Sequence, residues 1–162
     1  LPGDVERLAQ LGVVAAVQPP HMTLDPGGPE RDLGPERVPL MWPFKTMQED
    51  GATLAFGTDS PVVDVNSMGV LYSAITRQDP QTREPRGGWL PEQRISRADA
   101  IRAYTAGSAV AAQRAGEVGE LRPGMLADLA VVDTDLLACD AEDILDAKVV
   151  ATWMGGTCVY EA

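Results

Sequence analysis

The stretch ATLAFGTDSPV, residues 52–62, decides the fold expected for this chain. Its first six residues form a short, nearly all-apolar run, which is typical of a strand buried on both faces of a parallel sheet. The run stops at Gly57, and Asp59 and Pro61 follow at once. Functional groups gather at the carboxyl ends of parallel strands, but aspartate before Ser-Pro is also an ordinary turn residue. Asp59 is therefore either a turn residue or an oxygen ligand at a strand tip.

A second apolar run, VVAAVQ at residues 13–18, ends in Pro19-Pro20-His21. Proline cannot continue an interior strand, so His21 also follows a strand end. An imidazole and a carboxylate at neighbouring strand tips suit metal ligation or acid–base chemistry. The alternative for His21 is an ordinary loop histidine.

Helical patterns alternate with these strands, which predicts an α/β fold with a parallel sheet and helices outside it. The helices are expected at residues 5–12, 42–51, from 67 onward with Met68, Leu71, Tyr72 and Ile75 on one face, and 96–116. Ser96 is expected to cap the last of these helices, with Asp99 completing a capping box. Residues 22–40 and 79–94 are rich in proline, glycine and charge, and we expect both to be long loops.

The pattern changes after residue 116. A strand is predicted at 128–133, and residues 148–162 predict two strands joined by a Gly155-Gly156 turn. We therefore expect two domains, residues 1–116 and 117–162.

Composition limits the function classes. The chain has 162 residues and a net charge of -11, which argues against binding to nucleic acid or to an anionic membrane surface. Cys139 and Cys158 make no disulfide framework, although one disulfide is possible. No targeting or membrane-spanning pattern is present in the sequence, so we expect a cytoplasmic protein. The opening residues carry no initiator Met, which suggests a fragment.

Other candidates for a pocket lie between the strands. Trp42 could line a pocket and Lys45 could meet a substrate carboxylate; alternatively, Trp42 and Phe44 pack at the start of their helix. Trp89 is either a lid residue or a loop anchor. Arg77 and Arg86 are expected to be solvated.

Four stretches carry a family resemblance, and together they span nearly the whole chain. They are LGVVAAVQPPHM, LAFGTDSPV, the long AIRAYTAGSAVAAQRAGEVGELRPGMLADLAVVD, and VVATWMGGTCVYE. The chain thereby resembles the C-terminal part of metal-dependent amidohydrolases of the branch called amidohydrolase family 3, which includes N-substituted formamide deformylases. The resemblance implies the last βα units of a TIM (β/α)8 barrel, followed by part of a small β-sandwich.

The resemblance also implies a function. It implies hydrolysis of amide-type C–N bonds in a small-molecule substrate, with a divalent metal, zinc above all, that activates a water molecule. Asp59 is the implied metal ligand and proton shuttle, whereas His21, Trp42 and Lys45 are expected to face the substrate. The family's histidine ligands are absent from this sequence, so we expect no tightly bound metal in this chain.

Two further possibilities remain at this stage. The chain could be a truncated, catalytically inert structural module that self-associates, because two barrel strands leave open sheet edges. A homo-oligomer is expected for that reason. A metal-free binding domain of the doubly wound type is the remaining alternative, and the LRPGMLADL stretch argues against it.

Overall fold

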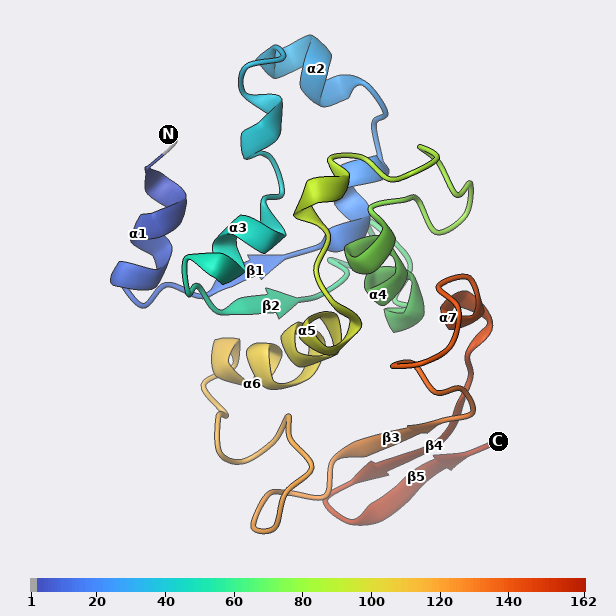
Figure 1. The fold of residues 1–162 in the computed structure, drawn as a ribbon. Coiled ribbons are helices and arrows are strands. Elements are labelled where there is room, and N and C mark those ends of the chain that lie inside the picture. The colour runs from blue at the N-terminus through green and yellow to red at the C-terminus, as the bar shows by residue number, and fades with distance from the viewer. Residues whose placement is uncertain (1–2) are drawn as a thin grey trace.

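The structure, a computed structural model, describes residues 3–162 and has a mixed α/β fold with two separate small sheets (Figure 1). The strands are β1 (Ala15–Val17), β2 (Leu54–Phe56), β3 (Leu129–Val132), β4 (Val149–Met154) and β5 (Thr157–Glu161). The α-helices are α1 (Asp4–Gln10), α2 (Gly28–Leu33), α3 (Phe44–Glu49), α4 (Ser67–Thr76), α5 (Arg97–Arg102), α6 (Ser108–Ala111) and α7 (Asp143–Asp146). Short 3₁₀ turns lie at η1 (Pro19–Thr23), η2 (Val38–Leu40) and η3 (Pro91–Gln93), and a π-helical turn, η4 (Ala103–Gly107), joins α5 to α6.

The first sheet confirms the predicted parallel pair. β1 and β2 run side by side in the same direction, with Ala15 opposite Leu54 and Val17 opposite Phe56 (Figure 1). Beyond the paired residues, the backbone N–H of Gly57 donates to the carbonyl of Val17 at 3.2 Å. The carboxyl ends of both strands therefore lie at one edge, and the segments that carry His21 and Asp59 leave from that edge.

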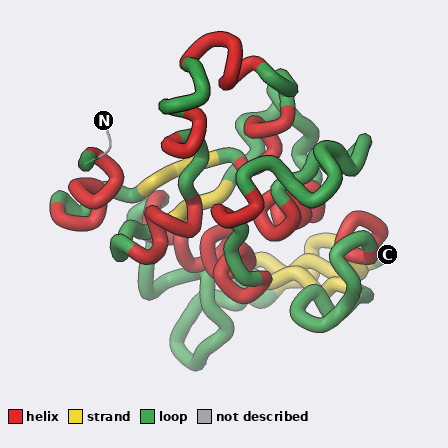
Figure 2. The backbone as a smooth tube through the Cα atoms, turned by 45° about the horizontal axis from the view of Figure 1, so that its top comes forward, coloured by secondary structure: helices red, strands yellow, loops and turns green. Residues whose placement is uncertain are grey.

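The segment from α5 to α6 packs against β2, and Figure 2 shows helices beside the strands of this pair. The Ser96 hydroxyl accepts a hydrogen bond from the Asp99 N–H at 3.1 Å, which confirms the predicted cap. The Ser108 hydroxyl donates to the Phe56 carbonyl at 3.0 Å and so joins this segment to β2. Gly107 lies against the backbone of Leu54, because a side chain there would overlap the Leu54 carbonyl oxygen. The small residues of this helical segment do let it approach a neighbour closely.

The main core lies around α4. The prediction of one apolar face on this helix was too narrow, because α4 packs between η1, α5 and α7 and is buried on most sides. The rings of Phe44 and Phe56 pack against each other in this core in a tilted arrangement, with a centroid distance of 5.6 Å. The fully buried side chains of α4 are Val70, Tyr72, Ser73 and Ala74, all at 0% exposure.

The second sheet is antiparallel in the order β3-β4-β5. Gly155 and Gly156 form the predicted two-residue turn between β4 and β5, both with positive φ, as a hairpin turn of this type requires. The short helix α7 lies between β3 and β4 in the chain and packs against α4, where Ile144 is only 2% exposed. Part of the C-terminal region thus belongs to the main core, and the division at residue 116 stays a prediction.

Two expectations need correction, and one open possibility is decided. Residues 22–40 are not a plain loop, since η1, α2 and η2 occupy much of the segment. Arg77 is not solvated: its side chain is completely buried. Cys139 and Cys158 are both free, so the possible disulfide is not present.

Within residues 3–162, no helix is long and apolar enough to cross a membrane.

Candidate functional site

A cavity of about 810 Å³ lies at the carboxyl ends of β1 and β2. One wall is the segment 60–66, which directly follows Asp59, and another includes Pro20, which directly precedes His21. The remaining walls come from residues 79–83 and from the end of α7. Residues that follow both strand ends therefore line one hollow, which makes this the candidate functional site, although Asp59 and His21 themselves are not among its lining residues.

Asp59 lies exposed at the tip of β2 with a left-handed backbone, φ +60°. Aspartate is among the few residues that tolerate this conformation. The turn is held by other groups: the Val62 N–H donates to the Asp59 carbonyl at 2.9 Å, and the Ser60 N–H donates to the Thr58 hydroxyl at 3.2 Å. Among residues 3–162 the Asp59 carboxylate has no hydrogen bond or ion pair, so it is available to an outside group.

His21 lies on η1, directly beyond the end of β1. Its backbone N–H donates to the Gln18 carbonyl at 3.0 Å, which fixes the turn. The Nε2 atom of the ring is buried and has no hydrogen-bond partner in the part of the chain that the structure describes. Buried polar atoms are almost always paired, so His21 is a strong candidate for contact with a group outside these residues.

Trp42 and Lys45 lie around the start of α3. Trp42 packs edge-on against Trp89, with ring centroids 5.7 Å apart. This contact supports the alternative interpretation, in which Trp42 has a packing role. The Nζ atom of Lys45 lies 3.8 Å from Glu49 Oε1, one turn along the same helix. No hydrogen bond or ion pair joins Lys45 to Asp59 or His21 within the described residues. The substrate-facing role of these two residues stays a prediction.

Sequence reasoning missed the role of Arg77, which fixes the backbone of Trp42 and Trp89. Its Nε atom donates to the Trp89 carbonyl and its Nη1 atom donates to the Trp42 carbonyl, each at 2.8 Å. The guanidinium also lies over the rings of Phe44, at 5.2 Å, and Trp89, at 5.6 Å. Burial lowers the pKa of Arg77 to about 10, so the group remains charged at neutral pH. No sequence signal separates Arg77 from the exposed Arg86, because the aromatic residues that cover it come from distant segments.

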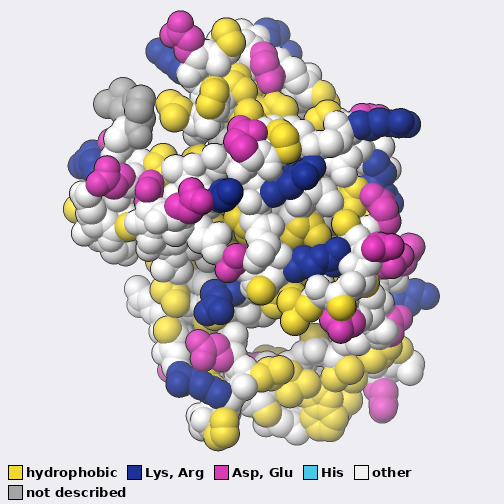
Figure 3. All heavy atoms as spheres, viewed as in Figure 1, with side chains coloured by type: hydrophobic (Ala, Val, Ile, Leu, Met, Phe, Trp, Pro, Cys, Tyr) yellow, Lys and Arg dark blue, Asp and Glu magenta, His cyan; other side chains and the backbone are white. Residues whose placement is uncertain are grey.

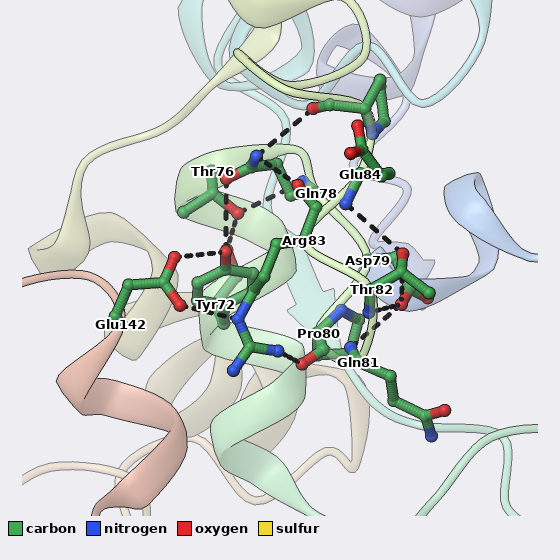
Figure 4. A network of polar contacts seen from close by, with 11 residues as sticks. Tyr72, Thr76, Gln78, Asp79, Pro80, Gln81, Thr82, Arg83, Glu84 and Glu142 are labelled. Atoms are coloured by element: carbon green, nitrogen blue, oxygen red, sulfur yellow. Dashed lines mark hydrogen bonds and ion pairs between the residues drawn. The ribbon is translucent and has the colours of Figure 1, made fainter.

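A polar network joins the segment 79–84 to α4 and to the C-terminal region (Figure 4). The Tyr72 hydroxyl donates to Glu142 Oε1 at 2.8 Å, and the Arg83 Nε atom donates to Glu142 Oε2 at 2.6 Å. Burial, with the nearby Glu142 carboxylate, raises the pKa of Tyr72 to about 12. The bond between Arg83 and Glu142 thereby ties the segment 79–84 to the C-terminal region.

Asp79 organises this loop by capping it. Its Oδ1 atom accepts hydrogen bonds from the N–H groups of Gln81 at 2.9 Å and Thr82 at 2.7 Å. Burial alone would raise the pKa of Asp79, but these hydrogen bonds outweigh it and lower the pKa. The segment 79–84 is thereby held as a defined wall of the cavity.

The donors at the site are too few to hold a catalytic metal. Residues 3–162 contain no group of three His, Cys, Asp or Glu side chains that could bind one. A catalytic zinc site takes about three protein ligands and a water molecule. Asp59 and His21 fit as single donors, one oxygen and one nitrogen, so further ligands would have to come from outside these residues.

Solved structures share this fold. The chain matches a metal-dependent hydrolase from Pyrococcus horikoshii with a TM-score of 0.75 and 29% identity, covering 87% of this chain and 28% of that one. It also matches the atrazine chlorohydrolase TrzN from Arthrobacter aurescens, solved with zinc, with a TM-score of 0.64 and 21% identity over 99% of this chain and 34% of that one. The fold is therefore that of a part of the metal-dependent hydrolases.

The sequence comparisons then give the family. The chain belongs to the amidohydrolase family, whose model matches residues 2–160. Curated relatives include the protein LONG AFTER FAR-RED 3 of Arabidopsis thaliana, 36% identical over 98% of this chain and 27% of that protein. Another is the N-substituted formamide deformylase of Arthrobacter pascens, 26% identical over 98% of this chain and 29% of that enzyme. The chain thus spans between a quarter and a third of the length of these relatives.

Proposed function

We propose that this chain forms the C-terminal part of a metal-dependent hydrolase that cleaves amide-type C–N bonds in a small molecule. The observation that carries the proposal is the free carboxylate of Asp59 at a strand tip, in a chain that matches the amidohydrolase family over residues 2–160. The likeness to an N-substituted formamide deformylase favours amide-type bonds over other substrates of such hydrolases.

The proposed architecture follows from the same likeness. β1 and β2 are two neighbouring strands of a TIM (β/α)8 barrel within residues 1–116, and residues 117–162 contribute strands to a small β-sandwich. The parallel register of β1 and β2 supports this arrangement, since barrel strands are parallel. The candidate site at the carboxyl ends of the strands is where such barrels hold their chemistry.

Asp59 has two roles in the proposal. It would supply one of the oxygen ligands of a divalent metal, zinc above all, which when bound would lower the pKa of a water molecule. The Asp59 carboxylate accepts a proton as the water oxygen attacks the amide carbon, and it returns the proton to the nitrogen as the C–N bond breaks. Its exposed position without a competing partner supports both roles.

The other candidate residues position the substrate in this proposal. His21 would turn its buried Nε2 atom toward a polar group of the substrate, which would satisfy that nitrogen. Trp42, which packs edge-on against Trp89, would contact an apolar part of the substrate. Lys45 would leave its weak, half-exposed pairing with Glu49 to meet a substrate carboxylate.

The test is made on the full-length protein, with zinc content and amide hydrolysis measured together. Asp59→Asn is expected to lower hydrolysis by about 100- to 10,000-fold and to reduce bound zinc. Asp50→Asn is the matched control, because Asp50 is an exposed aspartate at the end of α3, outside the site. Unchanged hydrolysis and zinc in Asp59→Asn would overturn the assignment of this residue.

A second candidate is an inert module that self-associates. Hydrophobic side chains gather over the C-terminal sheet (Figure 3), and the exposed ones include Val131, Met154, Val159 and Tyr160. Exposed apolar patches of this kind mark association surfaces. Light scattering of this chain is expected to give a dimer or larger assembly that Val159→Lys dissociates. A monomer at every concentration tested would rule this candidate out.

A further inference from the structure

A second cavity, of about 320 Å³, lies between the segments 22–29 and 79–89. Its walls are largely apolar: Met22, Pro26, Pro29, Pro85 and the ring of Trp89. We call this the loop pocket. Neither the proposed catalytic role of Asp59 nor the predicted substrate residues account for it.

The loop pocket is held in shape by contacts that cross it. The Trp89 Nε1 atom donates to Glu30 Oε1 at 3.0 Å, which joins one wall to the other. The Thr23 hydroxyl lies 3.4 Å from Asp79 Oδ2, which joins the walls a second time. Arg77 fixes the backbone of Trp89, because its Nε atom donates a 2.8 Å hydrogen bond to the Trp89 carbonyl. A cavity with both walls tied together is preformed, as ligand pockets usually are.

The loop pocket adjoins the candidate functional site. Asp79 lines both cavities, and η1 separates them: Pro20 faces the larger cavity, whereas Met22 faces the loop pocket. His21 lies between these two residues on the same turn. A molecule whose reacting bond lies near Asp59 and His21 could therefore extend a side group into the loop pocket.

The walls select the chemistry of that side group. Three carboxylates stand at the rim, and each already has partners: Asp25 pairs with Arg31, Asp79 caps its own loop, and Glu84 accepts from the Arg86 N–H. They need no ligand, but their charge disfavours an anionic one. A dry cavity of about 150 Å³ can already hold benzene, so the loop pocket has room for a phenyl or branched alkyl group.

We propose that the loop pocket is a specificity pocket that binds an uncharged apolar or aromatic substituent of the amide substrate and rejects an anionic one. This inference rests on the proposed function only in taking the ligand to be an amide substrate. The binding of the substituent itself does not depend on catalysis, so the two can be tested apart.

The binding test uses the full-length protein and isothermal titration calorimetry, which also works for a variant without Trp89. The probes are N-methyl-2-phenylacetamide, its 4-carboxyphenyl analogue and N-methylacetamide. The phenyl compound is expected to bind about tenfold or more tightly than either of the others, because only it fills the pocket without bringing in a negative charge. Pro26→Phe, which fills the pocket from its exposed rim, and Trp89→Leu are each expected to weaken its binding about tenfold.

Trp153→Phe is the control, because this tryptophan lies on β4 in the second sheet, away from the loop pocket. It should leave the affinity for the phenyl compound unchanged. Equal affinity for all three probes, or unchanged affinity in both pocket variants, overturns the proposal.

A kinetic measurement separates this proposal from the proposed function. If the protein hydrolyses amides, Pro26→Phe is expected to raise KM for the phenyl compound and to leave hydrolysis of N-methylacetamide unchanged. A loss of hydrolysis for both compounds in that variant counts against a specificity pocket. Selective binding of the phenyl compound without hydrolysis supports the pocket and overturns the hydrolase assignment instead.

Discussion

Arg77 Nη1 donates a 2.8 Å hydrogen bond to the carbonyl oxygen of Trp42, and this bond connects the end of α4 to the segment just before α3. The Arg77 side chain is completely buried and has no carboxylate within ion-pairing distance among the described residues. Aromatic rings and two backbone carbonyls take the place of a counter-ion. A single buried cation therefore holds the backbone of Trp42 and that of Trp89, which lines the loop pocket.

Replacing this cation is expected to be costly. Arg77→Met leaves the carbonyls of Trp42 and Trp89 without their donors, which should lower the free energy of unfolding by about 2–4 kcal/mol. Urea denaturation followed by tryptophan fluorescence measures the change. Arg86→Met is the control, since Arg86 is 94% exposed and should change stability by less than about 0.5 kcal/mol. Equal effects of the two variants would show that the buried guanidinium does not hold the segments together.

The ion pair between Glu142 and Arg83 predicts a dependence on acid. The Arg83 guanidinium, helped by the Tyr72 hydroxyl, lowers the pKa of Glu142 in the folded chain. The pair therefore adds stability above the ordinary glutamate pKa of 4.5, and this contribution is lost as the pH falls through the lower folded pKa. Because both side chains are largely exposed, the effect is a modest one.

The melting temperatures of Glu142→Gln and of the unmodified chain, measured over a range of pH, test the predicted direction of this pH dependence. The difference between them is expected to be largest near neutral pH and to vanish at strongly acidic pH, where the Glu142 carboxyl is protonated and therefore uncharged, like the glutamine amide. Glu36→Gln serves as the control, since Glu36 is exposed and forms no ion pair within residues 3–162. A difference that grows toward acid would contradict the predicted sign.

The close approach of η4 to β2 predicts a steric effect. Gly107→Ala would drive a methyl group into the Leu54 carbonyl oxygen, which is expected to cost about 1–3 kcal/mol of stability or more. Gly57→Ala is a matched control next to the same strand, because a side chain there meets nothing within 4 Å. Thermal unfolding of both variants provides the comparison. Should Gly107→Ala prove as stable as Gly57→Ala, the two segments cannot pack as closely as described.

Asp59 is expected to matter little for stability. Its carboxylate is exposed and the turn is held by the backbone and by Thr58, so Asp59→Asn should change the free energy of unfolding by less than about 0.5 kcal/mol. Asparagine also tolerates the left-handed backbone. Chemical denaturation measures this value. A loss of several kcal/mol would mean that the aspartate is a structural turn residue, and the functional reading of the strand tip would lose its support.

Local patterns in the sequence were enough to predict much of the fold. The two apolar runs gave β1 and β2, Ser96 capped its helix as expected, and Gly155-Gly156 formed the hairpin turn. Each of these features depends on residues close together in the chain, through burial, capping or backbone conformation. The family resemblance was also predicted, and the match over residues 2–160 confirmed it.

The helical segments inside the long loops were harder to predict. Residues 22–40 contain α2 between two 3₁₀ turns, although proline and glycine dominate the composition. α7 is short and strongly acidic, yet Ile144 reaches the main core. Both segments are stabilised by the residues that they pack against, and the local sequence pattern does not indicate which residues those are.

The sequence by itself determined where the strands end and that Asp59 and His21 follow those ends, because a change from apolar residues to proline and polar residues is a local property. Only the tertiary structure decided that the two ends lie side by side, that Arg77 is buried among Phe44, Trp42 and Trp89, and that two distant loops enclose a pocket. These features depend on contacts between residues far apart in the chain. For Arg77, the neighbours that the fold supplies, and not the residue type, set its burial and lower its pKa.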